Sequence, residues 1–313
     1  MSNQAAWIKS EGANLTLDSA ETPAPTANQL LIKTGAIGLN PVEAKLQKFK
    51  IFPIPYPNIL GLSFSGTVEK VGSSVTDFKA GDRVAVHRSS GHSTGPVGPF
   101  EHSSTGSYQK YVIADSQTTA KLEDNVTFEA AAAAITNLAT AVSALAISLK
   151  LDRPNPKGPN PANEGKKVLI YGGSSSVGGF AVHFAVRAGY TIITTSSPRN
   201  LATVTSLHPA KIIDHTQPAS SIVEELKAAG PYHAVFDTIG LPTTTTILGQ
   251  VLAEQGGELY ATQPPFGPLD LPSNVQRHFG SFPAAFEQPE NEEYRNWFYG
   301  IFGKYLGMGL VDE

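Results

Sequence analysis

The sequence predicts an α/β protein with two domains, a β-rich, barrel-like domain followed by a doubly wound parallel sheet. Three observations predict this fold. Short strand-like runs bounded by Gly, Pro, Asp and Ser fill the chain up to about residue 120. An apolar run at 168–170 then breaks into glycines and serines that lead into a helical pattern. Beyond it, strand-like and helical segments alternate, which implies right-handed crossovers between parallel strands.

The first domain is predicted from four strand-like runs. These are residues 30–34, 66–71, 83–86 and 108–113. The stretch 87–107 is rich in Ser, Gly, Thr, Pro and His, so we expect a long surface loop there. Residues 128–149 are apolar enough to resemble a membrane span, but they contain Glu129, Asn137 and several hydroxyl side chains. We therefore expect a buried helix at the domain junction.

The second domain begins after a proline-rich loop at 152–161, whose prolines forbid helix continuation. The predicted strands are 168–170, 191–195, 211–214, 234–237 and 258–261. The predicted helices are 177–188, a helix from about 200, 220–229 and 244–253. From Phe279 onward the chain is rich in aromatic residues, which can line an apolar cleft, form a subunit interface or simply pack in a core.

Composition narrows the class of protein. The 313 residues suffice for two cores, and the net charge of -4 lacks the basic excess of a nucleic-acid binder. The absence of cysteine excludes disulfides and every Cys-ligated metal site. No apolar signal core is present at residues 1–7, so we expect a cytoplasmic enzyme, monomeric or homodimeric, that binds neither nucleic acid nor membrane.

The glycine-rich turn at 171–179 carries the strongest functional signal. The order strand, glycine turn, helix brings backbone N–H groups and the positive end of a helix to one place, as binding of a pyrophosphate requires. The turn therefore predicts a dinucleotide site. The alternative is a tight turn whose glycines only relieve crowding.

Four motifs, taken in their order along the chain, resemble the medium-chain dehydrogenase/reductase superfamily. They are residues 40–45, 61–68, 81–84 and 171–173. This resemblance implies a GroES-like β-barrel catalytic domain at 1–136, a Rossmann NADP-binding domain at 137–280, and a C-terminal segment, 281–313, that returns towards the catalytic domain. Residues 196–200 (Ser-Ser-Pro-Arg-Asn) look like those of fungal trans-acting enoyl reductases and related dehydrogenases of polyketide pathways.

Two departures from that superfamily carry meaning. Its zinc enzymes have a Gly-His-Glu sequence where this chain has Gly-Leu-Ser at 61–63, so the chain resembles the zinc-free branch and we expect no metal site. His87, His92 and His102 are irregularly spaced in a polar stretch, and we expect them to be solvated. The superfamily usually closes with a further helix and strand, whereas this sequence stops at Glu313, so we expect a shorter or differently completed end.

The end of the second predicted parallel strand indicates the cofactor. An NAD site usually has an acid there, but residues 194–199 offer hydroxyls and Arg199, which suit a 2′-phosphate. NADPH is therefore favoured over NADH; the alternative is that Arg199 only begins a solvated helix. By resemblance, the cofactor-binding residues are Asn40, Gly172, Gly173, Ser174, Ser175, Ser176, Val177, Gly178, Ser197, Arg199, Asn200 and His215.

Three residues are candidates for the chemistry itself. Reduction of a conjugated double bond requires a hydride, stabilisation of the resulting enolate and a proton. By resemblance, Lys45 lies beside the nicotinamide, where an ammonium can stabilise an enolate or donate a proton, and Thr140 also approaches it. Tyr56 is a second possible donor. The alternatives are an exposed helix lysine, a packing tyrosine and a threonine bonded to its own helix.

These features together predict an NADPH-dependent, zinc-independent reductase of activated carbon–carbon double bonds, plausibly a trans-acting enoyl reductase in polyketide biosynthesis. Its substrate would be a small-molecule or carrier-bound enoyl compound, with a polyketide synthase as a possible partner. Two alternatives stay open: a quinone or enone oxidoreductase on the same scaffold, and a non-catalytic NADPH-binding partner protein.

Overall fold

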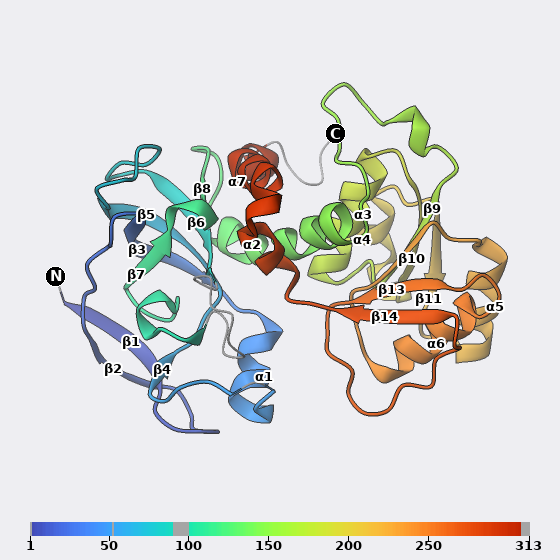
Figure 1. The fold of residues 1–313 in the computed structure, drawn as a ribbon, viewed down its shortest axis with the longest axis horizontal. Helices are drawn as coiled ribbons and strands as arrows, with labels where there is room; N and C mark the ends of the chain where they lie inside the picture. The colour runs from blue at the N-terminus through green and yellow to red at the C-terminus, as the bar shows by residue number, and fades with distance from the viewer. Residues whose placement is uncertain (1, 52, 90–99, 308–313) are drawn as a thin grey trace. The chain divides into compact units, whose positions relative to one another are not determined.

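The computed structural model describes residues 2–51, 53–89 and 100–307 (Figure 1). The chain packs as two compact units. The first comprises residues 1–136 and 286–313, and the second comprises residues 137–285. The fold is the mixed α/β fold that the sequence predicts, with antiparallel sheets in the first unit and a parallel sheet in the second.

Two antiparallel sheets and the short helix α1 form the N-terminal part of the first unit. The five-stranded sheet has the order β7-β3-β5-β6-β8 and the three-stranded sheet the order β2-β1-β4. The strands are β1 (Asn3–Ile8), β2 (Thr16–Ala20), β3 (Gln29–Gly38), β4 (Asn58–Ile59), β5 (Ser63–Val71), β6 (Arg83–His87), β7 (Tyr111–Asp115) and β8 (Thr119–Lys121). Helix α1 (Pro41–Phe49) follows β3, with Pro41 in its first turn.

Two predictions for this unit are wrong in part. The strand predicted at 108–113 enters the five-stranded sheet only at Tyr111, because Tyr108 pairs with Leu60 and Ala6 at the other sheet. The loop predicted at 87–107 begins one residue too early, since His87 is the last residue of β6. The same stretch also contains a 3₁₀ turn, η2 (Ser103–Thr105). Residues 90–99 lie outside the described part of the chain.

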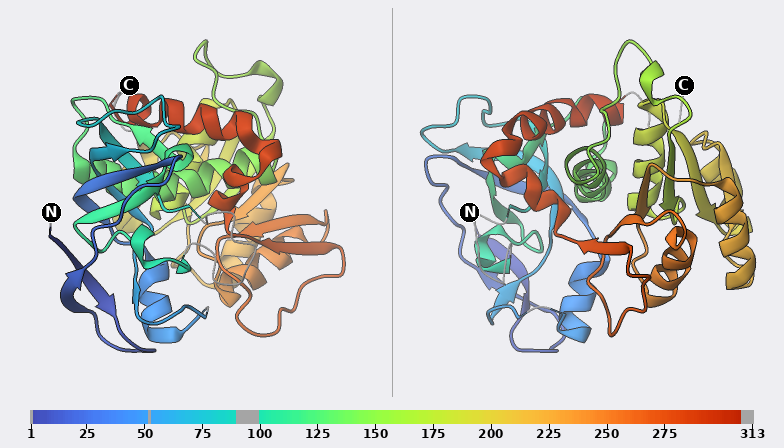
Figure 2. Two further views of the ribbon diagram at one scale, coloured as in Figure 1. Left: turned by 60° about the vertical axis from the view of Figure 1, so that its left-hand side comes forward. Right: turned by 45° about the vertical axis from the view of Figure 1, so that its right-hand side comes forward.

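The aromatic C-terminal part packs as core. Helix α7 (Glu292–Gly307) lies along β8 in the first unit (Figure 2), and Gly303 approaches the carbonyl of Lys121 so closely that a Cβ would collide with it. Phe286, Phe298 and Phe302 are buried, with Phe286 stacked on Phe298 at 5.0 Å between ring centroids. The sequence left open whether the aromatic residues line a cleft, form an interface or pack in a core. Phe286, Phe298 and Phe302 pack in the core.

The apolar segment predicted as one buried helix starts as α2 (Phe128–Val142) and continues as a π-helical turn, η4 (Ser143–Ser148). Ser143 Oγ donates to the Ala139 carbonyl at 2.6 Å, at the point where the hydrogen-bond pattern changes. Length and composition would allow residues 128–148 to span a membrane, but 72% of the most apolar window is buried within the protein. The segment is therefore a core helix.

The second unit is a six-stranded, all-parallel sheet of order β11-β10-β9-β12-β13-β14. Its strands are β9 (Lys167–Tyr171), β10 (Thr191–Ser196), β11 (Lys211–Asp214), β12 (Ala234–Asp237), β13 (Gly257–Ala261) and β14 (Val275–Phe279). Its helices are α3 (Ser176–Arg187), α4 (Leu201–Thr205), α5 (Ala219–Ala229) and α6 (Pro242–Leu252). Alternate strand residues such as Leu169, Val235 and Leu259 pack with α5 and α6 on one face. The helix predicted from about 200 is only five residues long and follows a 3₁₀ turn that Pro198 begins.

Candidate active site

The glycine turn joins β9 to the N-terminus of α3, and its glycines are required by close contacts. Gly172 has φ +92°, which favours glycine. A Cβ on Gly178 would collide with the Gly172 carbonyl oxygen, and a Cβ on Gly173 would collide with the Thr194 hydroxyl. These glycines therefore let the first turn of α3 approach the end of the strand, where the N–H groups of a helix start can meet an anion.

Hydroxyl groups from neighbouring strands fix this turn. Ser175 is the N-cap of α3, and its Oγ accepts from Gly178 N at 3.0 Å and lies 2.9 Å from Thr238 Oγ1. Thr238 in turn donates to the Tyr171 carbonyl at 2.8 Å, and Gly172 N donates to Thr195 Oγ1 at 2.9 Å. Ser174 and Ser176 are exposed beside the helix end. The turn is thus fixed by hydrogen bonds, with two exposed serines at the helix start where a phosphate could bind.

The predicted adenosine-phosphate residues gather at the ends of β10 and β11. These strands pair in register up to Ser196 and Asp214, and His215 N donates to the Ser196 carbonyl at 3.3 Å. Ser197 Oγ is buried and has no hydrogen-bond partner among the described residues. A buried hydroxyl without a partner is costly, so Ser197 is poised for an acceptor that a nucleotide phosphate or ribose would supply.

The side chains around Ser197 that could contact a nucleotide phosphate or ribose differ in their exposure to solvent. Arg199 and His215 are exposed, and Asn200 is half-buried. The acid at this edge, Asp214, accepts from Thr216 N at 2.8 Å and from its hydroxyl at 2.7 Å. The cationic and neutral donors of this edge therefore fit a phosphate better than two ribose hydroxyls.

The N-terminus of α1 in the first unit is held by a buried carboxylate. Glu43 Oε2 accepts from Asn40 N at 2.7 Å, and Glu43 Oε1 accepts from Asn40 Nδ2 at 3.1 Å and Leu62 N at 2.9 Å. Burial raises the pKa of Glu43, while these donors oppose the rise. Asn40 Nδ2 also donates to Ser63 Oγ at 3.1 Å. The helix start thus shares one network with Leu62 and Ser63, the two residues that follow Gly61.

A second buried pair lies next to Ser63. Ser63 and His87 are directly opposite each other in the β5–β6 ladder, and the His87 Nδ1 nitrogen lies 3.0 Å from Thr136 Oγ1. Burial lowers the pKa of His87 to about 4, and the Glu287 carboxylate opposes this shift. The expectation that His87 is solvated is therefore wrong, because β6 carries it into the interior. We call Asn40, Glu43, Ser63, His87 and Thr136 the polar cluster.

The arginine that follows His87 points to other partners. Arg88 is buried, and its guanidinium donates to the carbonyls of Ile59 and His102 and to Thr105 Oγ1, at 3.2, 2.7 and 3.0 Å. Burial lowers the pKa of Arg88 to about 9, and Glu43 opposes this shift. Arg88 thus joins the chain before Ser63 to the segment 102–105, in the last part of the predicted loop.

The three predicted catalytic residues are distributed over both units. Lys45 is half-buried on α1, and burial lowers its pKa. Tyr56 packs against the apolar cluster around Leu46, and its pKa is raised, first by burial. Thr140 is half-buried on α2, in the second unit. The first unit brings Lys45 and Asn40 onto one helix, and the second holds Thr140 with the glycine turn.

The histidines of the predicted loop do not share one environment. His102 is exposed, and His92 lies outside the described residues. Within residues 2–51, 53–89 and 100–307, no group of three His, Cys, Asp or Glu side chains is placed to hold a metal ion. Sequence reasoning missed His87, Arg88 and Thr136. The one available signal is that Thr136 precedes Thr140 by four residues, which places both on one helix face.

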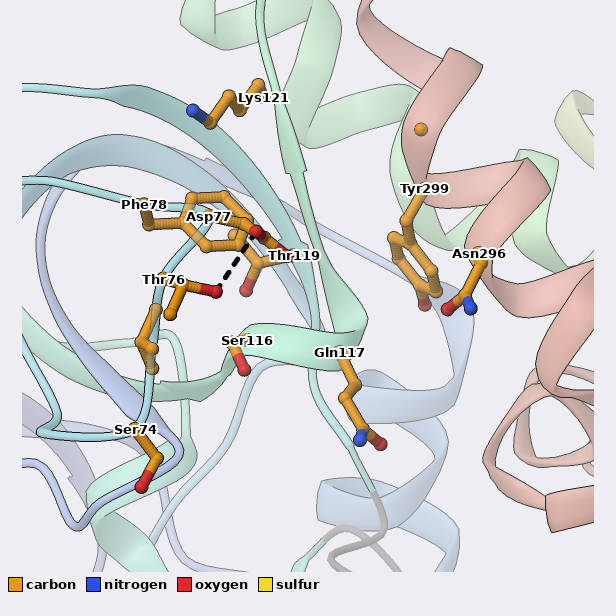
Figure 3. Close-up of a pocket in the computed structure, with 12 residues that line it drawn as sticks. Ser74, Thr76, Asp77, Phe78, Ser116, Gln117, Thr119, Lys121, Asn296 and Tyr299 are labelled. Atoms are coloured by element: carbon orange, nitrogen blue, oxygen red, sulfur yellow. Dashed lines mark hydrogen bonds between the residues drawn. The ribbon is translucent and has the colours of Figure 1, made fainter.

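A pocket of about 390 Å³ opens elsewhere in the first unit (Figure 3). Polar side chains of the loop at 74–78, of the chain at 116–121 and of α7 line it. Tyr299 stands on its α7 side, with a hydroxyl that has no hydrogen-bond partner among the described residues. None of the predicted site residues lines this pocket, so its lining offers no support for the predicted chemistry.

Comparisons with known proteins were made for both sequence and fold. Residues 26–124 match the family model of the alcohol dehydrogenase GroES-like domain. The chain is 36% identical over 217 residues to dehydrogenase pigH of Monascus ruber, covering 68% of this chain and 58% of that protein. It is 32% identical over 280 residues to trans-enoyl reductase himH of Aspergillus japonicus, covering 88% and 78%. The native structure of mycobacterial Rv1454c complexed with NADPH matches with a TM-score of 0.75 and 23% identity over 99% of this chain and 90% of that one.

Proposed function

Because this chain belongs to the medium-chain dehydrogenase/reductase superfamily, we propose that it is an NADPH-dependent, zinc-independent reductase of activated carbon–carbon double bonds. Its substrate is an enoyl thioester, free or carrier-bound, as the relatives named trans-enoyl reductases suggest. A polyketide synthase that presents such a thioester is the partner that this substrate implies. The observation that carries the proposal is the closely packed glycine turn at the start of α3, together with the buried Ser197 hydroxyl, which has no hydrogen-bond partner within the described part of the chain.

The residues of the second unit fit the nucleotide. The first turn of α3 would hold the pyrophosphate with its backbone N–H groups and the positive end of its dipole. Ser197 and Arg199 would hold the 2′-phosphate, the first with a buried hydroxyl and the second with a forked cation. When bound, NADPH supplies the hydride.

The first unit supplies the electrostatics of the reaction. As hydride adds to the β-carbon, negative charge develops on the carbonyl oxygen of the substrate. Lys45 stabilises this charge, because its partial burial places the ammonium in a medium of reduced dielectric constant. Glu43 fixes the start of the helix that carries Lys45 through its three accepted hydrogen bonds.

The cofactor preference has its own test. Arg199→Asp should weaken NADPH binding by at least tenfold more than NADH binding, because a carboxylate repels the 2′-phosphate and accepts from ribose hydroxyls. Enhancement of nicotinamide fluorescence on titration measures both affinities. Equal weakening of the two cofactors would remove Arg199 from the phosphate site. Arg153→Asp, an equal change of charge at a half-buried position in the proline-rich loop, is the control.

The activity is tested by an acceptor screen. Purified protein and NADPH are mixed with crotonyl thioester, a longer enoyl thioester, an enone and a quinone, and loss of absorbance at the reduced nicotinamide band is followed. Oxidation with enoyl thioesters above all others supports the proposal. Preference for quinones would make the protein a quinone oxidoreductase, and NADPH binding without oxidation by any acceptor would make it a non-catalytic binding protein.

A further inference from the structure

The polar cluster contains a buried imidazole that the proposed chemistry does not use. His87 Nδ1 lies 3.0 Å from Thr136 Oγ1, and these residues are 49 positions apart in the chain. His87 is 7% exposed and Thr136 8%. A buried imidazole that faces a hydroxyl and titrates well below neutrality is neutral at the pH of a cell, so it can both accept and donate a proton.

A carboxylate is fixed beside this imidazole. Glu287 is 7% exposed, and its Oε2 accepts from Ser89 Oγ at 3.0 Å. Its negative charge favours the protonated form of His87. His87 and Ser89 lie two residues apart in the chain and Glu287 lies in the C-terminal segment of the same unit, which therefore brings together an orienting hydroxyl, a carboxylate and an imidazole.

The position of Thr136 connects this set to the proposed reaction. Thr136 lies four residues before Thr140 on α2, so the two hydroxyls lie on one face of the helix. Thr140 is the residue expected beside the nicotinamide. At the other end of the set, Ser63 stands opposite His87 and accepts from Asn40, the N-cap of the helix that carries Lys45.

We propose that Thr136 delivers the proton that completes the reduction and that His87 supplies it. This inference rests on the proposed function, which leaves that proton without a source. Thr136 is then a catalytic residue, and His87 and Glu287 are positioning residues that act through it.

The proton transfer from His87 through Thr136 conserves atoms and charge. Solvent protonates His87 Nε2, which forms an imidazolium beside the Glu287 carboxylate. His87 gives its Nδ1 proton to Thr136 Oγ1 as the Thr136 hydroxyl proton passes to the substrate α-carbon, where the enolate electron pair forms the new C–H bond. One solvent proton is consumed, and the imidazole is left neutral and returns to its first tautomer by exchange with solvent.

The test compares Thr136→Val, Thr136→Ser and His87→Gln with the wild-type protein. A general acid contributes typically 10²–10⁴-fold, so Thr136→Val should lower kcat with crotonyl thioester by about 100-fold or more. KM and the NADPH affinity should stay within about twofold of wild type, since the change acts on the proton transfer. Thr136→Ser should restore most of kcat because it keeps the hydroxyl. Thr118→Val, which removes another buried hydroxyl of the same unit, is the control and should leave kcat unchanged.

Two further readouts separate a proton path from a merely structural role. The kcat of the wild type should fall as pH rises, because less imidazolium forms, and His87→Gln should remove this dependence. The groups facing the pair are Glu287 at His87, with Tyr299 and Arg295 of α7 around Glu287. In the protein without nucleotide, nitrogen NMR of the imidazole should show Nδ1 protonated in the wild type, and Glu287→Gln should lower the pKa of His87 further.

The outcomes distinguish the two proposals. If none of the acceptors in the screen causes the wild-type protein to oxidise NADPH, the proposed function fails and the proton path fails with it. If wild type turns over while Thr136→Val and His87→Gln keep its kcat and pH dependence, the proton path alone is overturned. Thermal unfolding of each variant shows that a lost rate is not lost folding. If Thr136→Val does not fold, the pH dependence of kcat in His87→Gln carries the test.

Discussion

Replacing Glu43 by Gln should destabilise the first unit far more than the loss of one charge suggests. Both carboxylate oxygens of Glu43 accept N–H groups, Oε2 from Asn40 N and Oε1 from Asn40 Nδ2 and Leu62 N. A Gln side chain keeps one acceptor oxygen, and its NH₂ group must face one of these donors. The substitution therefore creates a buried pair of donors with no acceptor.

The magnitude follows from that count. A hydrogen bond to a charged group is worth about 1.5–3 kcal/mol, and a buried unsatisfied donor costs about 1–3 kcal/mol. Burying the charge of Glu43 has a cost, which also raises the pKa of this residue, and Gln avoids that cost. This gain offsets part of the lost hydrogen bonding, so we expect the free energy of unfolding to fall by about 2–4 kcal/mol. For a unit of this size, a loss of about 3 kcal/mol lowers Tm by roughly 6–12 °C.

Thermal unfolding followed by circular dichroism measures this shift. Glu21→Gln is the matched control, because Glu21 is an exposed glutamate of the same unit, and it should change Tm by less than about 2 °C. Amide exchange at Asn40 and Leu62 should accelerate in Glu43→Gln, since both N–H groups lose a charged acceptor. If Glu43→Gln unfolds with the Tm of the control, the network does not hold the start of α1, and the reasoning is refuted.

Three other predictions test separate parts of the molecule. Lys45→Ala should lower kcat by about tenfold or more with NADPH affinity nearly unchanged, since Lys45 acts on the charge of the substrate; unchanged turnover would remove Lys45 from the reaction. Gly178→Ala should weaken NADPH binding by more than tenfold at a stability cost of about 1–3 kcal/mol, because its Cβ collides with the Gly172 carbonyl; titration and thermal unfolding measure the two effects, and wild-type affinity would contradict the close approach. Between pH 6.5 and 4 the unfolded chain binds a proton at His87 that the folded protein does not, so stability should fall by about 1.4 kcal/mol per pH unit as the pH is lowered. His87→Gln should lack this extra loss in urea titrations at stepped pH, and identical pH slopes for the two proteins would show that His87 titrates normally.

The parallel sheet was predictable because its signals are local. Strands β9 to β13 are short runs separated by helical patterns, and this alternation implies parallel strands joined by right-handed crossovers. The glycine turn could be assigned for the same reason, since its strand and helix adjoin it in the chain. Strand β14 was missed because its run, 275–279, mixes polar and apolar residues at the edge of the sheet.

The polar cluster was not predictable, because its contacts join distant parts of the chain. His87 lies at the start of a stretch of loop-like composition, and only pairing of β6 with β5 turns it inward against Thr136. The three-stranded sheet was missed for a similar reason, since Trp7 pairs with Ile59, which lies 52 positions further along the chain, and no local pattern reveals such a pairing. Long-range pairing thus decided what local composition could not.

Within the first unit, the surroundings of His87 suit a side chain that gains and loses a proton better than one that keeps a fixed charge. Arg88 follows His87 on the chain, but its guanidinium donates to the carbonyls of Ile59, Gly61 and His102 and to the Thr105 hydroxyl, and its charge is opposite to that of Glu43. That charge is held in place, because moving it would leave buried acceptors unpaired. His87 has instead a hydroxyl at Nδ1 and a carboxylate nearby, so adding a proton costs less there than its burial alone would require. The two adjacent side chains therefore differ in role. Arg88 keeps a charge that holds the chain at 59 against the segment 102–105, and His87 stays neutral and can transfer a proton.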